Sequence, residues 1–186
     1  MYAVSEMVLN SRIIGVLIAP GYDEPQLSRV MQMLCLKGAT VRVLSNVESR
    51  SVAIQGKHGA LIMPDLLLED LHASDLDGLI VTAGESVDRL SADEKILTLI
   101  LQLQHSNKPI GASGNGAMVL AAAGLVAERR IAGTDDIKEK INEAGGYYVE
   151  QKLVVDHNLV TAYSDIEIKH LVEAIVLLLE PATAYG

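Results

Sequence analysis

Residues 108–118 read KPIGASGNGAM, and this stretch decides the fold. Lys108 to Ser113 has the length and apolar character of a buried strand, and a helix follows it after a sharp turn at residues 114–116. A strand that bends sharply into a helix is typical of α/β enzymes that hold a nucleophile at the tip of the bend. Here the tip is Gly114, which has no side chain. The stretch therefore predicts a catalytic type of fold without its reacting atom.

Buried strands and amphipathic helices alternate on both sides of this elbow. Strands are predicted at 12–19, 41–45, 78–82 and 108–113, a β-hairpin at 51–62, two or three strand segments in 147–162, and helices after 23, around 96–103, after the elbow up to Gly124, at 137–144 and from about 165 to 179. Such alternation predicts an α/β protein with a mostly parallel central sheet and helices on both faces. We expect a flavodoxin-like three-layer sandwich with a small β-hairpin.

Length and composition limit the class of protein. The chain has 186 residues, so we expect a single domain at 12–180 between an N-terminal arm (1–11) and a C-terminal tail (181–186). It lacks a secretory signal pattern or an apolar run of membrane-spanning length, and it has one cysteine, which predicts a cytoplasmic protein with no membrane contact and no disulfide. A net charge of −9 and the absence of Phe and Trp argue against a nucleic-acid partner.

The glycine-rich elbow also approaches three other motifs. Gly111-Ala112-Ser113-Gly114-Asn115 fails as G-x-S-x-G at its last position. Gly114 to Val119 resembles G-x-G-x-x-G, with Asp135 about 20 residues on, but the third glycine is Val119, and Ala117 stands where a P-loop needs lysine. No cofactor is predicted. Free amides at Gly114, Asn115 and Gly116 could still hold a small carboxylate or phosphate, which is a secondary hypothesis.

Several further segments form a distinctive set. They are Gly56-Lys57-His58-Gly59 with Pro64-Asp65, Asp75 to Val81, Ala123 to Val126, Asp136 to Gly145 and Leu153 to Thr161. With the elbow, they resemble the ThiJ/PfpI family, the intracellular protease I-like branch of the class I glutamine amidotransferase-like superfamily. The resemblance runs from about Arg12 to about Leu179. It implies a homo-oligomer, at least a dimer.

The same resemblance implies where the reacting groups should be. The family's elbow cysteine corresponds to Gly114, the histidine after it to Asn115, and a glutamate in the first helix to Gln26. The turn that lends an oxyanion-hole amide corresponds to Thr82–Asp88, which includes Gly84 and in which only the carboxylate of Asp88 survives. Thiolate chemistry needs all of these groups. In serine hydrolases, loss of the nucleophile alone costs roughly a million-fold in turnover, so we predict no catalytic residue.

Other reactive side chains have simpler interpretations. In the family frame Ser113 precedes the tip, so its side chain is expected to point into the packed strands with no histidine partner. Cys35 lies on the apolar stripe of the first predicted helix (Leu27, Val30, Met31, Leu34 and Cys35) and is expected to be buried and inert. The five histidines show no metal-ligand spacing, so no metal site is predicted. Asp88 ranks ahead of Glu85 and Glu24 among the carboxylates, because it corresponds to a family position near the site.

Three hypotheses of function remain open. The first is a ThiJ/PfpI-like protein that has lost its cysteine-dependent chemistry and acts in binding, assembly or a chaperone-like role. The second is an active hydrolase or glyoxalase-like enzyme with a rebuilt site that uses Ser113, Asp88 or a bound water. The third is a ligand-sensing domain similar to the C-terminal domains of large catalases, whose elbows also lack the cysteine.

Overall fold

The structure is a computed structural model and describes residues 8–180. Its strands are β1 (Ile13–Leu17), β2 (Thr40–Ser45), β3 (Ile54–Gln55), β4 (Leu61–Ile62), β5 (Leu66–Leu67), β6 (Gly78–Val81), β7 (Ile110–Ser113), β8 (Arg130–Ile131), β9 (Tyr147–Tyr148), β10 (Leu153–Asp156) and β11 (Leu159–Ala162). Its α-helices are α1 (Glu24–Leu36), α2 (Val87–Ser91), α3 (Glu94–His105), α4 (Ala117–Ala122), α5 (Lys138–Glu143) and α6 (Ile168–Leu179). Residues 1–7 of the predicted arm and the predicted tail lie outside the described residues.

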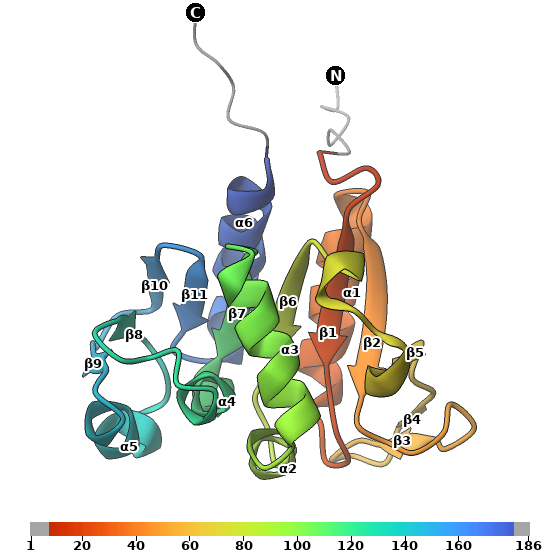
Figure 1. Ribbon diagram of the computed structural model, residues 1–186, viewed down its shortest axis with the longest axis horizontal. Coiled ribbons are helices and arrows are strands. Elements are labelled where there is room, and N and C mark those ends of the chain that lie inside the picture. The colour runs from red at the N-terminus through yellow and green to blue at the C-terminus, as the bar shows by residue number, and fades with distance from the viewer. Residues whose placement is uncertain (1–7, 181–186) are drawn as a thin grey trace, which may run out of the picture.

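A seven-stranded sheet forms the centre of the molecule (Figure 1). The strand order is β10-β11-β7-β6-β1-β2-β5, and every neighbouring pair is parallel except β10 with β11. Parallel neighbours require crossover connections, which helices supply except between β2 and β5, where the chain passes through the β3–β4 hairpin. The elbow strand β7 lies in the interior of the sheet between β11 and β6, so its carboxyl end is fixed on both sides.

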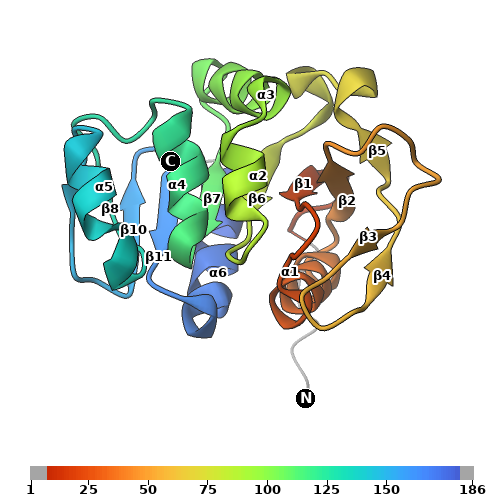
Figure 2. The ribbon, with the colours of Figure 1, turned by 90° about the horizontal axis from the view of Figure 1, so that it is seen from below.

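Helices cover both faces of the sheet (Figure 2). Helices α1 and α6 pack on one face, and α2, α3 and α4 lie on the other. Strand side chains alternate between the two layers: Leu79 and Val81 of β6 join the core under α3 and α4, whereas Ile80 joins the core under α1 and α6. Leu9, in the predicted arm, is also fully buried in that second core. The predicted three-layer α/β sandwich is confirmed.

Helix α1 differs from the prediction in the face that it buries. Asp23 caps its N-terminus by accepting a hydrogen bond from the Gln26 amide (2.8 Å), and the buried residues are Gln26, Leu27, Val30 and Leu34. The expected burial of Cys35 is wrong, because its side chain is exposed. The row at 26, 30 and 34 faces the core, so Cys35 lies on the exposed flank of the helix.

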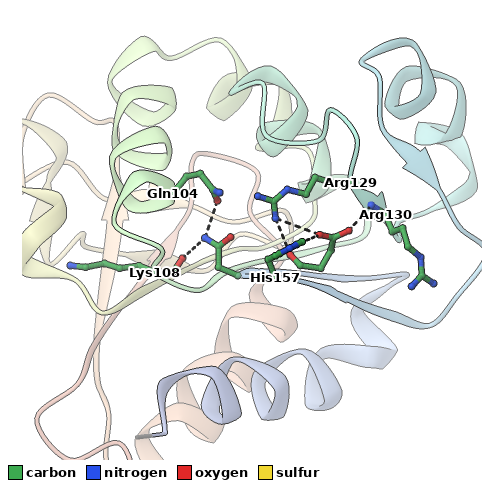
Figure 3. Close-up of polar contacts among 7 residues, drawn as sticks. Gln104, Lys108, Arg129, Arg130 and His157 are labelled. Atoms are coloured by element: carbon green, nitrogen blue, oxygen red, sulfur yellow. Dashed lines mark hydrogen bonds and ion pairs between the residues drawn. The ribbon is translucent and has the colours of Figure 1, made fainter. Parts of the chain in front are cut away.

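The turn between β10 and β11 is held by a polar network at the side of the sheet (Figure 3). Asp156 accepts hydrogen bonds from the Arg130 amide (3.0 Å) and the His157 ring (2.7 Å), while Asn158 Nδ2 donates to Gln104 (2.8 Å). Burial raises the pKa of Asp156, but the hydrogen bonds and the nearby Arg129 charge outweigh it and hold that pKa below its usual value. His157 thus lies at the surface, where its side chain is 81% exposed.

Three small elements were not predicted: helix α2, the edge strand β5 and strand β8, which pairs in parallel with β9 of the predicted segment 147–162. Each is five residues or shorter, too short for a periodic pattern to stand out. None of the helices within residues 8–180 combines the length and apolar character needed to cross a bilayer.

Candidate functional site

The elbow after β7 has the predicted geometry. β7 ends at Ser113, a 3₁₀ turn spans Gly114–Gly116, and α4 begins at Ala117. Gly114 has a φ of +52°, in the left-handed region that a side chain disfavours. A Cβ atom at this position would lie 3.1 Å from the Ala83 Cβ and 3.6 Å from the Thr134 Cγ2. The bend is therefore intact, and its tip offers no nucleophilic atom.

Gln26 links three elements beneath the tip. Its Oε1 atom accepts hydrogen bonds from the Ala83 amide (2.7 Å) and the Ser113 hydroxyl (2.7 Å). A backbone N–H can only donate, so the atom facing Ala83 must be the oxygen of the Gln26 amide. Ser113 is fully buried, as is nearly all of Gln26. The Ser113 hydroxyl is bonded to an amide rather than to a histidine, and nothing in this contact activates it as a nucleophile.

Asn115 forms a reciprocal pair with the backbone of Gly84. The Gly84 amide donates to Asn115 Oδ1 (3.0 Å), and Asn115 Nδ2 donates to the Gly84 carbonyl (3.1 Å). The Ala83 amide is already bonded to Gln26. Both amides of the turn that the resemblance associates with oxyanion binding are therefore bonded to side chains of this chain. An oxyanion would have to displace one of those side chains to reach them.

A cavity of about 380 Å³ opens at the elbow. It is lined by Asp23, Gln26, Lys57, Ala83, Gly84, Glu85, Gly114, Asn115, Thr134, Asp136, Ser164 and Asp165. Four of these residues are acidic and one is basic. Four of the five positions singled out from the sequence, Gln26, Gly84, Gly114 and Asn115, thus line one cavity. Asp88 does not: its side chain is exposed in the first turn of α2.

Lys57, the one basic residue of the cavity, is held in place by a turn bonded to helix α1. Glu24 accepts hydrogen bonds from the His58 amide (2.6 Å), the His58 ring (2.7 Å) and the Ala60 amide (3.3 Å). Desolvation raises the pKa of Glu24, but these hydrogen bonds and one from its own backbone outweigh it and lower the pKa to about 2. The Lys57 amide donates to the Tyr22 carbonyl (3.0 Å). The β3–β4 turn is therefore fixed beside the cavity.

Asp135, the acid considered for dinucleotide binding, has a different role. It accepts hydrogen bonds from the hydroxyls of Tyr148 (3.0 Å) and Tyr163 (3.3 Å). Burial, together with the hydrogen bond to Asp135 and its charge, raises the pKa of Tyr148 to about 12. Asp135 lies in a 3₁₀ turn just before α5 rather than at the end of a strand of the main sheet. Its position does not match the ribose-binding acid of a dinucleotide fold.

Sequence reasoning missed most of the cavity wall. The sequence gives Lys57 no signal beyond its place in a glycine-rich turn, and it does not mark Thr134, Asp136, Ser164 or Asp165 as site residues. These residues lie in loops that are far apart in the sequence, so no local spacing could have grouped them. Within residues 8–180, no three His, Cys, Asp or Glu side chains are grouped to hold a metal ion.

The fold and the elbow define a class of protein: an α/β sandwich whose site lies where the central strand β7 bends sharply into a helix. A family model, described as the DJ-1/PfpI family, matches residues 12–177. The chain belongs to the DJ-1/PfpI family, as the resemblance to ThiJ/PfpI proteins predicts.

Relatives with names that report an activity are distant in sequence. The putative cysteine protease YraA of Bacillus subtilis is 28% identical, over 82% of this chain and 89% of that protein. The deglycase TK1284 of Thermococcus kodakarensis is 24% identical, over 79% of this chain and 87% of that one. The activities in these names belong to those relatives.

Solved structures agree in fold. A ThiJ/PfpI domain protein from Brachyspira murdochii superposes with a TM-score of 0.83 at 20% identity, covering 91% of this chain and 96% of that one. A two-domain protein from Anabaena variabilis, with DJ-1/ThiJ/PfpI-like and ferritin-like domains, gives 0.87 at 21% identity over 95% of this chain. This chain spans half the length of that two-domain protein.

Proposed function

We propose that this protein is a member of the DJ-1/PfpI family that has lost thiol-dependent catalysis and binds small polar molecules in the cavity at the elbow. The proposal rests on the missing side chain at the tip of the elbow and on the hydrogen bonds among the groups beside it. The tip has no side chain, and the groups beside it, Gln26, Asn115 and the amides of Ala83 and Gly84, are bonded to one another. A catalytic site needs donors that are free for the transition state.

The cavity itself supports a binding role. Its volume of about 380 Å³ is within the range of small-molecule sites, and its wall mixes charged, amide and hydroxyl groups from several loops. We also propose that the protein is cytoplasmic and forms a homo-oligomer. Light scattering of the purified chain measures that assembly directly.

A reconstruction of the family pattern tests the loss of catalysis. The triple variant Gly114→Cys, Asn115→His and Gln26→Glu restores the thiol and both partner groups that the family resemblance implies. The double variant Asn115→His and Gln26→Glu is the matched control without the thiol. Wild type, double variant and triple variant are assayed for peptide hydrolysis, α-oxoaldehyde conversion and deglycation.

We expect turnover only in the triple variant. Turnover by the pure wild-type protein that disappears in Ser113→Ala would overturn the proposal and support the rebuilt enzyme. Labelling of wild-type Ser113 by a fluorophosphonate would point the same way, because that reagent requires an activated hydroxyl. The buried hydrogen bond from Ser113 to Gln26 predicts no labelling.

A further inference from the structure

The floor of the elbow cavity presents a hydrogen-bond donor that the protein does not use. Because Gln26 Oε1 faces Ala83 and Ser113, its Nε2 group is turned away from them. Gln26 is 2% exposed and lines the cavity, and within residues 8–180 Nε2 has no hydrogen-bond partner. Thr134 lines the same cavity, and its buried Oγ1 also lacks a partner in that part of the chain. Nε2 is not among the fully buried unpaired atoms of the described residues, so it remains open to the cavity, where the oxygen of a ligand can accept its hydrogen bond.

The rim of the cavity is acidic. Asp23, Glu85, Asp136 and Asp165 face a single cation, Lys57, which gives the lining a formal charge of −3. Glu85, Asp136 and Asp165 are all exposed. A field of this sign attracts cations and repels anions, although water and salt screen it.

The elbow glycines do not reverse this preference. Helix α4 is only six residues long, so its dipole adds little positive potential at Gly114 to Gly116. The amides of Ala83 and Gly84 are bonded to side chains. The small anion considered from the sequence would therefore meet four carboxylates and few free donors.

We infer that the cavity binds a small primary ammonium compound that also carries a carbonyl oxygen. The oxygen accepts a hydrogen bond from Gln26 Nε2 at the floor, and the ammonium group lies among the rim carboxylates. This assignment rests on the proposed binding function and adds the charge and hydrogen-bonding pattern of the ligand. Because residue 26 is a glutamine, the floor of the cavity donates a hydrogen bond. A glutamate carboxylate there would place a second acceptor where Nε2 donates.

Three probes of nearly equal size separate charge from shape. Glycinamide is cationic, glycolamide replaces its ammonium group by a hydroxyl, and glycolate is an anion. Each is titrated into the full-length, isotope-labelled protein just below neutral pH, and the backbone amide shifts of Ala83 and Gly114 report occupancy. We expect glycinamide to bind at least about threefold more tightly than glycolamide, and glycolate to bind most weakly.

Matched variants locate the charge effect. The double variant Asp136→Asn and Asp165→Asn should weaken glycinamide binding at least about threefold and leave glycolamide binding nearly unchanged. Glu173→Gln removes an exposed carboxylate of α6 outside the cavity lining, where it pairs with Lys169, and should change neither. Gln26→Glu should weaken glycolamide, because an acceptor replaces the donor that faces its carbonyl oxygen.

Two outcomes would overturn the inference. One is tighter binding of glycolate than of glycinamide, which would assign the cavity to anions. The other is the absence of shifts at Ala83 and Gly114 with all three probes. Neither outcome affects the proposed loss of catalysis, which the turnover assays test separately. Turnover by the wild-type protein would refute that loss, but it would not change the expected order of the three binding affinities.

Discussion

Replacing Gly114 by alanine should destabilise the protein, because the elbow requires a left-handed backbone at its tip. The φ of Gly114 is +52°, and a residue with a side chain in this region costs roughly 1–2 kcal/mol. The new Cβ would also lie 3.1 Å from the Ala83 Cβ, so Ala83 must move by a few tenths of an ångström. Lower entropy of the unfolded chain returns only about 0.4–1 kcal/mol. We expect the unfolding free energy to fall by about 1–2 kcal/mol and Tm by about 2–8 °C.

Urea denaturation of the Gly114→Ala variant and of the wild type measures this difference. Gly124→Ala is the matched control, since Gly124 also has a positive φ (+74°) but nothing within 4 Å of the added Cβ. Gly124→Ala should lower the unfolding free energy less than Gly114→Ala does. The additional loss in Gly114→Ala should decrease when this substitution is combined with Ala83→Gly. If Gly114→Ala is as stable as the wild type while Gly124→Ala is destabilised, the strain at the elbow does not exist and the reasoning fails.

Three further substitutions probe the polar contacts around the site and the sheet. Asn115→Ala should lower the unfolding free energy by about 1–2 kcal/mol, because the Gly84 amide loses its partner and the Gly84 carbonyl keeps only the longer bond from the Val87 amide (3.4 Å); an unchanged urea midpoint would contradict this. The pKa of Glu24 is lowered from 4.5 to about 2, so the stability contributed by its ionised form is complete above 4.5 and is lost as pH falls toward 2. In thermal melts, the Tm of the Glu24→Gln variant should fall less than that of the wild type as the pH is lowered through this range. Identical Tm–pH profiles of the two proteins would show that the bonds to His58 contribute nothing. The pKa of Asp156 is also lowered, so Asp156→Asn should reduce Tm more at neutral pH than well below pH 3.8, and an equal loss at both would refute the ionic origin.

The fold could be predicted in detail because buried strands and one-sided helices leave periodic signals. The apolar run at 78–82 and the stripe from Ile96 to Leu103 match β6 and α3 closely. Cys35 was misplaced because α1 buries the polar Gln26 in its core-facing row, which turns the helix slightly from the face that hydrophobicity alone favours. That burial is stable only because Ala83 and Ser113 supply hydrogen bonds, and they lie about 57 and 87 residues away in the sequence.

The candidate site was predictable only in part, for a related reason. The local sequence predicts the elbow, since Gly114 lies at a junction of strand and helix. The family resemblance adds Gln26 and Asn115. The acidic rim has no local signature, because Asp23, Glu85, Asp136 and Asp165 converge from four separate loops. Single carboxylates in loops are common on any surface, and only their arrangement in space gives them a shared effect on charge.

The hydrogen bonds at the elbow explain how a bend suited to catalysis persists without a reacting group. Gln26 joins α1 to the ends of β6 and β7, and Asn115 joins the start of α4 to the turn after β6. These contacts hold the same strand ends that a nucleophile would need held, and they occupy the amides of Ala83 and Gly84. A free amide at Gly84 would be available to an oxyanion, whereas an amide bonded to Asn115 adds stability. One backbone amide cannot be bonded to a side chain and be free for a transition state at the same time. In this chain the Gly84 amide is bonded to Asn115.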